Sequence, residues 1–83
     1  MIEFNFNREN IKETIDDIKQ RTESYLNSPS PRGVRHRASF QLYDPNKQII
    51  LSGSLFKDFR IMVKTMYKIG KGVINLSLTP HPF

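Results

Sequence analysis

The chain has 83 residues, of which 37% are hydrophobic and 25% charged, and its formal net charge is +5. This length suits one domain, 1–83, and the branched and aromatic residues exclude a disordered chain. The chain contains no cysteine, which excludes disulfides and thiolate metal sites. The first residues do not resemble a secretory signal, and no apolar run reaches the roughly 20 residues of a membrane span. We therefore expect a cytoplasmic protein without a membrane partner.

The source of the chain is indicated by its amino-acid usage. It has a single alanine, Ala38, among many Ile, Lys and Asn residues. This usage is typical of an AT-rich genome, such as that of a low-GC bacterium or its phage.

The first third of the chain predicts a strand and a helix. Alternating apolar and polar residues over 2–7 predict a short strand. Helical spacing predicts a helix over about 9–26, with Asn7 or Asn10 as its cap. Its apolar stripe consists of Ile11, Ile15, Ile18, Thr22, Tyr25 and Leu26. The Pro-rich segment 27–34 should end this helix and form an exposed connection.

A hairpin is predicted in the middle of the chain. Residues 37–43 alternate, with Ala38, Phe40 and Leu42 on one face. Asp44 to Lys47 has turn chemistry, so residues 48–52 should return as the second strand. Three consecutive apolar residues over 49–51 are typical of a strand near the middle of a sheet.

A second helix and a last strand should follow the hairpin. Ser54 is suited to cap this helix, and Gly70 follows where a left-handed C-terminal cap belongs. Its apolar stripe is Leu55, Phe59, Met62 and Met66, widened by Phe56, Val63, Tyr67 and Ile69. The alternative makes 60–69 a strand that turns at 70–72. Residues 73–78 alternate again, and Pro80 and Pro82 should end that strand and leave a Pro-containing tail at 79–83.

The predicted order of elements is β-α-β-β-α-β. With right-handed connections, this order places two helices on one face of a four-stranded antiparallel sheet. The fold class is therefore α+β, with the ferredoxin-like split arrangement. If the first strand is absent, an α-β-β-α-β variant remains.

Positive charge is concentrated in the second part of the chain. Residues 1–27 contain four basic and six acidic residues, a net charge of −2, whereas residues 28–83 contain nine and two, a net charge of +7. Such asymmetry indicates a polyanion partner. On a helical wheel, one side of the second helix carries four cations, which we call the basic ridge: Lys57, Arg60, Lys64 and Lys68. The alternative is a solvated helix face.

A second basic cluster surrounds His36 and consists of Arg32, Arg35 and Arg37. If Ala38 and its alternate neighbours face the helices, the open face of the sheet becomes a polar, cationic platform. Its residues are Arg35, Arg37, Ser39, Gln41 and Tyr43, joined by Asn75 and Ser77. The alternative is an ordinary exposed strand face. Tyr43 is the one aromatic residue expected there, so base stacking of the RNA-recognition-motif kind is not predicted.

These features favour non-catalytic binding of nucleic acid, DNA or RNA, through salt-sensitive phosphate contacts. We expect no enzyme activity, no metal and no cofactor, because neither histidine has further ligands at metal spacing. One alternative is a small module that binds an acidic protein surface and regulates or inhibits a host macromolecule. A third is a metal-free ribonuclease that uses His36 with Arg35, Arg37 and Tyr43. An unpaired strand edge near the C-terminus would also favour a homodimer.

Overall fold

The computed structural model describes residues 2–29 and 32–82. In this part of the chain the predicted order β-α-β-β-α-β is confirmed, and the variant without a first strand is wrong. The elements are β1 Ile2–Phe6, α1 Ile11–Asn27, β2 Val34–Tyr43, β3 Ile49–Ser54, α2 Phe59–Ile69 and β4 Gly72–Pro82. The alternative strand over 60–69 is also wrong, because these residues lie in α2.

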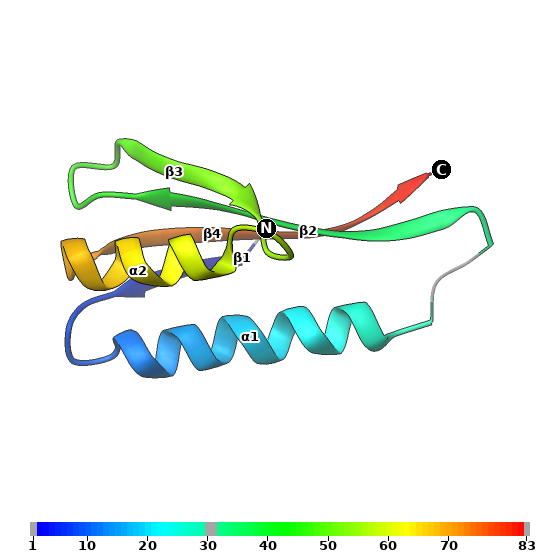
Figure 1. The fold of residues 1–83 in the computed structure, drawn as a ribbon, viewed down its shortest axis with the longest axis horizontal. Helices are drawn as coiled ribbons and strands as arrows, with labels where there is room; N and C mark the ends of the chain where they lie inside the picture. Colours follow the sequence, from blue (N-terminus) through cyan, green and yellow to red (C-terminus); the bar gives the residue numbers. More distant parts are fainter. Residues whose placement is uncertain (1, 30–31, 83) are drawn as a thin grey trace.

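Within the described residues, four strands form one antiparallel sheet in the order β1-β4-β2-β3. The two helices lie on one face of the sheet (Figure 1). Each strand-helix-strand unit therefore spans one intervening strand: β4 lies between β1 and β2, and β2 lies between β3 and β4. The predicted ferredoxin-like α+β arrangement is confirmed, with β4 and β2 at its centre.

The core lies between the sheet and the two helices. Alternation on β2 directs Ala38, Phe40 and Leu42 toward the helices, as predicted, and all three are buried. The largest fully buried side chains are Phe40, Ile18, Leu42, Met62, Met66, Ile74 and Leu76. Most of them belong to the two central strands and to α2. The open face of the sheet is consequently left to the polar residues of the same strands.

The three apolar residues at the start of β3 do not lie in the middle of the sheet. β3 is an edge strand, and Ile49 and Ile50 are 53% and 42% exposed. The pairing is irregular here, because Tyr43 is opposite Ile49 whereas Leu42 is opposite Leu51. The strand order, rather than local composition, decides burial at this position.

The turn between β3 and α2 also differs from the prediction. Ser54 ends β3 and does not cap α2, which begins at Phe59 with Asp58 as its N-cap residue. The Ser54 hydroxyl accepts a hydrogen bond from the Phe56 N–H at 3.1 Å, and the Ser54 carbonyl accepts one from the Asp58 N–H at 2.8 Å. These bonds close a turn over 55–58. Phe56, predicted for the apolar stripe, is 59% exposed in that turn.

Other local predictions are confirmed in part. The N-cap residue of α1 is Asn10, one of the two predicted, but its side chain forms no capping hydrogen bond. Asn7 lies in the turn before the helix, where its side-chain oxygen accepts hydrogen bonds from the N–H groups of Glu9 and Asn10. The hairpin turn closes when the Lys47 N–H donates to the Asp44 carbonyl at 2.9 Å. At the end of α2, Gly70 adopts a left-handed φ of 72° and donates to the Met66 carbonyl.

Pro80 and Pro82 do not end the last strand, which runs from Gly72 to Pro82. Residues 79–82 of the predicted tail therefore belong to β4, and Phe83 lies outside the described residues. Because the Ala38 carbonyl accepts a hydrogen bond from Leu55, even-numbered residues of β2 face β3 and odd-numbered residues bond to β4. Arg37 lies opposite Thr79, so the odd-numbered residues of β4 form the backbone hydrogen bonds to β2. The proline nitrogens point to the opposite side, where the pairing with β1 ends at Leu76. No ladder hydrogen bond is lost there.

β2 and β4 extend beyond their neighbours. β3 pairs with β2 as far as Ser39, and β1 pairs with β4 as far as Leu76, whereas β2 and β4 remain paired from Ala38 and Leu78 to Val34 and Pro82. Figure 1 shows this two-stranded arm projecting past the rest of the sheet. The second basic cluster lies on it or just before it.

Candidate functional site

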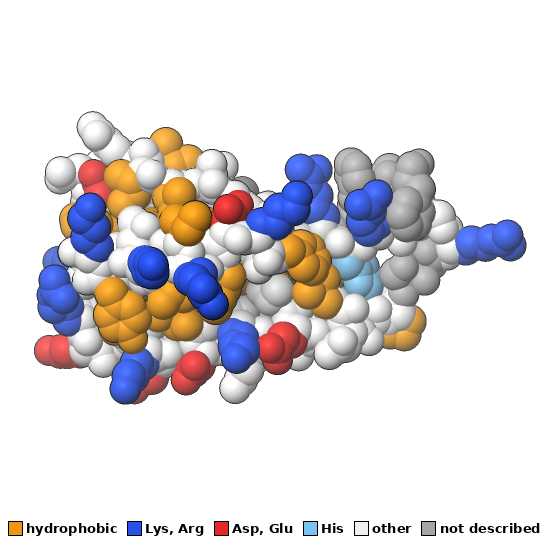
Figure 2. Space-filling model, in the orientation of Figure 1, with side chains coloured by type: hydrophobic (Ala, Val, Ile, Leu, Met, Phe, Trp, Pro, Cys, Tyr) orange, Lys and Arg blue, Asp and Glu red, His pale blue; other side chains and the backbone are white. Residues whose placement is uncertain are grey.

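The basic ridge lies on the surface of the molecule. Lys57 is in the turn before α2, and the other three cations, Arg60, Lys64 and Lys68, are on the helix itself. All four side chains are exposed, and none forms an ion pair with a described acidic residue. Figure 2 shows Lys and Arg side chains over α2 and, along α1, acidic side chains mixed with basic ones.

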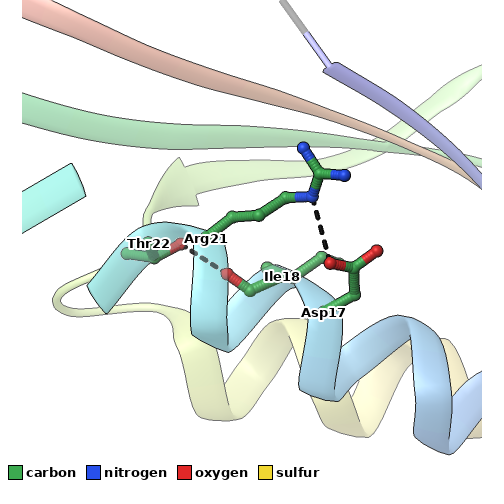
Figure 3. Close-up of polar contacts among 4 residues, drawn as sticks. All are labelled: Asp17, Ile18, Arg21 and Thr22. Atoms are coloured by element: carbon green, nitrogen blue, oxygen red, sulfur yellow. Dashed lines mark hydrogen bonds and ion pairs between the residues drawn. The ribbon is translucent and has the colours of Figure 1, made fainter. Parts of the chain in front are cut away.

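Helix α1 shows what a solvated, charge-balanced helix face looks like in this protein. The Arg21 Nε atom donates to the Asp17 carboxylate at 3.0 Å, one turn away (Figure 3). The Arg21 guanidinium also lies 5.5 Å from the centre of the Phe4 ring. Opposite charges at this spacing support a helix, whereas the like charges of the ridge oppose helix formation by a few tenths of a kcal/mol per pair. The ridge therefore lacks the local compensation seen on α1.

Two apolar side chains interrupt the ridge. Ile61 and Tyr67 are 51% and 43% exposed. At about 100° per residue, Tyr67 lies roughly 20° from Arg60 around the helix axis, and Ile61 lies roughly 20° from Lys68. An aromatic ring between cations can stack on a base or a sugar after the cations have contacted the phosphates.

The arginines of the second cluster lie elsewhere. Arg35 and Arg37 alternate with the helix-facing residues of β2, so they extend toward the open face of the sheet and are exposed. Arg32 is exposed in the connection before β2. The structure therefore brings Arg35 and Arg37 together but separates them from Lys64, which is on the outer side of α2. The predicted site residues form two surfaces instead of one.

A hollow of about 570 Å³ lies beside Arg35 and Arg37, where β3 ends and the chain turns away. It is lined by Arg35, His36, Arg37, Ala38, Ser39, Gly53, Ser54 and Phe56. Phe56 adds an exposed aromatic ring beside the predicted platform, where Tyr43 was the one aromatic residue expected. Helical periodicity had assigned this residue to the core, and only the early end of β3 places it in the hollow.

The residues of the ribonuclease hypothesis do not converge. The His36 ring lies on the helix side of β2, with its centre 4.4 Å from the centre of the Tyr25 ring of α1. Arg35 and Arg37 extend to the opposite face, because neighbouring residues of a strand alternate. Tyr43 lies at the other end of β2, where its hydroxyl donates to the Gln41 side chain at 3.0 Å. A general base and its cations need to reach one phosphate, and this arrangement separates them.

We accordingly expect no cleavage when the purified protein is incubated with end-labelled RNA. The RNA should stay uncleaved with the His36→Ala variant as well, and gel electrophoresis measures the cleavage. Product that appears with the wild-type protein and disappears with His36→Ala would contradict the non-enzymatic interpretation.

Two further properties concern the described residues as a whole. None of their helices is long and apolar enough to cross a membrane. In residues 2–29 and 32–82, no three His, Asp or Glu side chains are grouped so that they could hold a metal ion.

The chain matches no protein-family model, no curated protein and no solved structure.

Proposed function

We propose that this protein is a non-catalytic binding protein for nucleic acid, or for another polyanion, and that the basic ridge contacts the phosphates. The observation that carries the proposal is the run of four exposed cations, Lys57, Arg60, Lys64 and Lys68, without a described carboxylate partner. Arg60, Lys64 and Lys68 follow one another along α2 at intervals of about one turn, and Lys57 lies in the turn before the helix. The apolar stripe on the other side of α2 holds that row rigidly on the core.

The ridge suits phosphate contacts better than base readout. Lysine is a point charge that binds phosphate without strict geometry, and three of the four cations are lysines. The ridge has no Asn or Gln with which to pair with a base edge. The expected binding is therefore weakly sequence-specific and driven by counterion release.

Phosphate binding by the ridge determines how the affinity depends on the salt concentration. Four phosphate contacts give a slope of log affinity against log salt of about −3.6 on duplex DNA. The affinity for an arbitrary duplex should thus fall by roughly 100-fold between about 50 and 200 mM salt. Fluorescence anisotropy with a labelled duplex measures both quantities. An affinity that does not change over this range would contradict phosphate binding.

The double variant Lys64→Gln/Lys68→Gln tests the ridge itself. It should flatten the salt slope by up to about two units, since two phosphate contacts are lost. Its free energy of unfolding should change by less than about 0.5 kcal/mol per site, because both side chains are exposed. Relief of like-charge repulsion along α2 acts in the stabilising direction.

The matched control is Lys12→Gln/Lys19→Gln on α1, where both lysines are also exposed. It removes the same amount of positive charge from α1, which carries both acidic and basic side chains. The slope of log affinity against log salt should therefore stay close to that of the wild type. If both double variants flatten the slope equally, net charge rather than the ridge drives binding. If the ridge variant binds as the wild type does, the ridge only keeps the protein soluble, and the alternative of an acidic protein partner takes its place.

A further inference from the structure

Two stretches of sheet edge are shielded against further strands: the end of β4 beyond its pairing with β1, and the edge strand β3. On β4, Pro80 points its nitrogen toward the open side and offers no donor there. On β3, Asp58 covers the end of the edge: its carboxylate accepts the Ser54 N–H at 3.1 Å and its own N–H donates to the Ser54 carbonyl. The irregular pairing between Leu42 and Ile49 distorts the other end of β3. Shielding of this kind is how sheet proteins avoid unwanted strand pairing.

Within residues 2–29 and 32–82, nothing comparable shields the edge of β2 beside the hollow at His36. The last hydrogen bond between β2 and the returning chain runs from the Leu55 N–H to the Ala38 carbonyl at 3.1 Å. Even-numbered residues of β2 face this side, and Leu55 occupies the position opposite Ala38. The next backbone groups on this edge, the N–H and the carbonyl of His36, point into the hollow. No described strand pairs with them there. The hollow is therefore a short, open strand edge in line with β3.

The chemistry of this pair identifies the class of ligand. The His36 N–H is a donor and the His36 carbonyl is an acceptor on the same edge. A residue of an extended peptide that runs antiparallel to β2 offers the complementary acceptor and donor from its own backbone. A phosphate group offers acceptors and leaves the His36 carbonyl without a donor.

We propose that an extended segment of a partner protein adds to β2 at this edge, as a short strand that continues the line of β3. This proposal goes beyond the proposed function and uses none of the ridge residues. The side chains around the edge define what the segment must carry. Residues directly opposite each other on antiparallel strands share a face, so the positions opposite Arg35 and Arg37 lie beside those guanidinium groups. Acidic residues suit both positions.

The residue between the two acidic positions lies opposite His36 and shares its face, which is the half-buried side that packs against Tyr25. An apolar side chain suits this position, and the exposed ring of Phe56 adds apolar surface in the hollow. The matching segment therefore reads acidic, apolar, acidic in extended conformation. A second copy of this chain is disfavoured as the occupant. Pairing two β2 edges about His36 would place Arg35 of one copy opposite Arg37 of the other.

The test uses a fluorescein-labelled octapeptide of alternating Asp and Val and two methylated forms of it. One form carries N-methyl groups on the Val amides, which should face β2, and the other carries them on the Asp amides, which should face away. We expect the Val-methylated form to bind at least about tenfold more weakly, because it loses backbone donors at the edge. The Asp-methylated form should bind like the parent peptide. Fluorescence anisotropy with the full chain gives the affinities.

Two measurements on the protein locate the site. Arg37→Gln should weaken the parent peptide by about fivefold or more, whereas Lys19→Gln on α1 should leave the affinity unchanged. Amide exchange followed by NMR should slow by at least about tenfold at His36 when the peptide saturates the protein. The exchange rates report strand addition even if the charge contribution of Arg37 is small.

Several outcomes would overturn the proposal. One is equal affinity of the two methylated forms, which would show attraction between charges without strand pairing. Another is a parent peptide that does not bind, or that leaves the exchange of the His36 amide unchanged. If oligothymidylate displaces the peptide and its own binding needs Arg37, the hollow takes nucleic acid instead. Lys64→Gln/Lys68→Gln should not alter peptide binding, so failure of this proposal and failure of the ridge proposal can be told apart.

Discussion

Leu42→Ala is expected to lower the free energy of unfolding by about 3–4 kcal/mol. Leu42 is on the central strand β2, and none of its surface is exposed. Removing a fully buried leucine side chain loses its transfer free energy and leaves a cavity that rigid neighbours do not refill. A chain of this length has a total stability of about 4–12 kcal/mol, so the variant should be close to unfolding. Urea denaturation measures the change.

The control for Leu42 is Ile49→Ala on the edge strand. It removes a similar apolar side chain, but Ile49 is 53% exposed, so the loss should stay below about 1 kcal/mol. The pair tests the strand order directly. Were residues 49–51 in the middle of the sheet, as the run of apolar residues predicted, the two variants would lose similar amounts.

Gly72→Ala is expected to lower the free energy of unfolding by about 3 kcal/mol. A Cβ atom at this position would overlap the Tyr43 carbonyl oxygen of β2 and approach two carbons of the Phe6 ring to 3.2 Å. The ring can give way, but the carbonyl belongs to the backbone of a central strand. Overpacking of this kind costs about 1–3 kcal/mol and more when the backbone must shift. Thermal and urea unfolding should agree on the loss.

Gly33→Ala separates steric overlap from backbone strain. Gly33 has a φ of 83°, and nothing described lies within 4 Å of the place a Cβ would take. Alanine there should cost only the strain of a left-handed conformation, about 1 kcal/mol. A Gly72 variant as mild as the Gly33 variant would contradict the close packing of β1, β4 and β2 at this point.

The two proposed surfaces meet at the turn between β3 and α2. Lys57 of this turn belongs to the basic ridge, and the neighbouring Phe56 lines the hollow. A peptide in the hollow and a polyanion on the ridge would therefore lie near each other, and the acidic residues of the peptide would repel the negative charges of the polyanion. Binding of one should weaken binding of the other, although the two use different residues.

Local physical chemistry was sufficient to predict the elements. Period-two alternation gave β1, β2 and β4, helical spacing gave α1 and α2, and the glycine at position 70 marked the end of α2. It also separated the two faces of β2, because Ala38, Phe40 and Leu42 are buried and Arg37 is exposed. The type of each element and the face on which a side chain lies depend on near neighbours along the chain. The alternation of apolar and polar residues is therefore enough to predict both.

What the tertiary structure decided depends on which strands lie side by side. Pro80 was expected to end a strand, yet it is harmless because β1 has already ended where its nitrogen points. The apolar run at 49–51 indicated a central strand, yet β3 lies at an edge. The hollow exists because β3 ends at Ser54 while β2 continues, which exposes the backbone of His36 and turns Phe56 outward. The side chains that a strand presents are set by its own residues. Whether its backbone N–H and carbonyl groups are free to form hydrogen bonds is set by the strands that lie beside it.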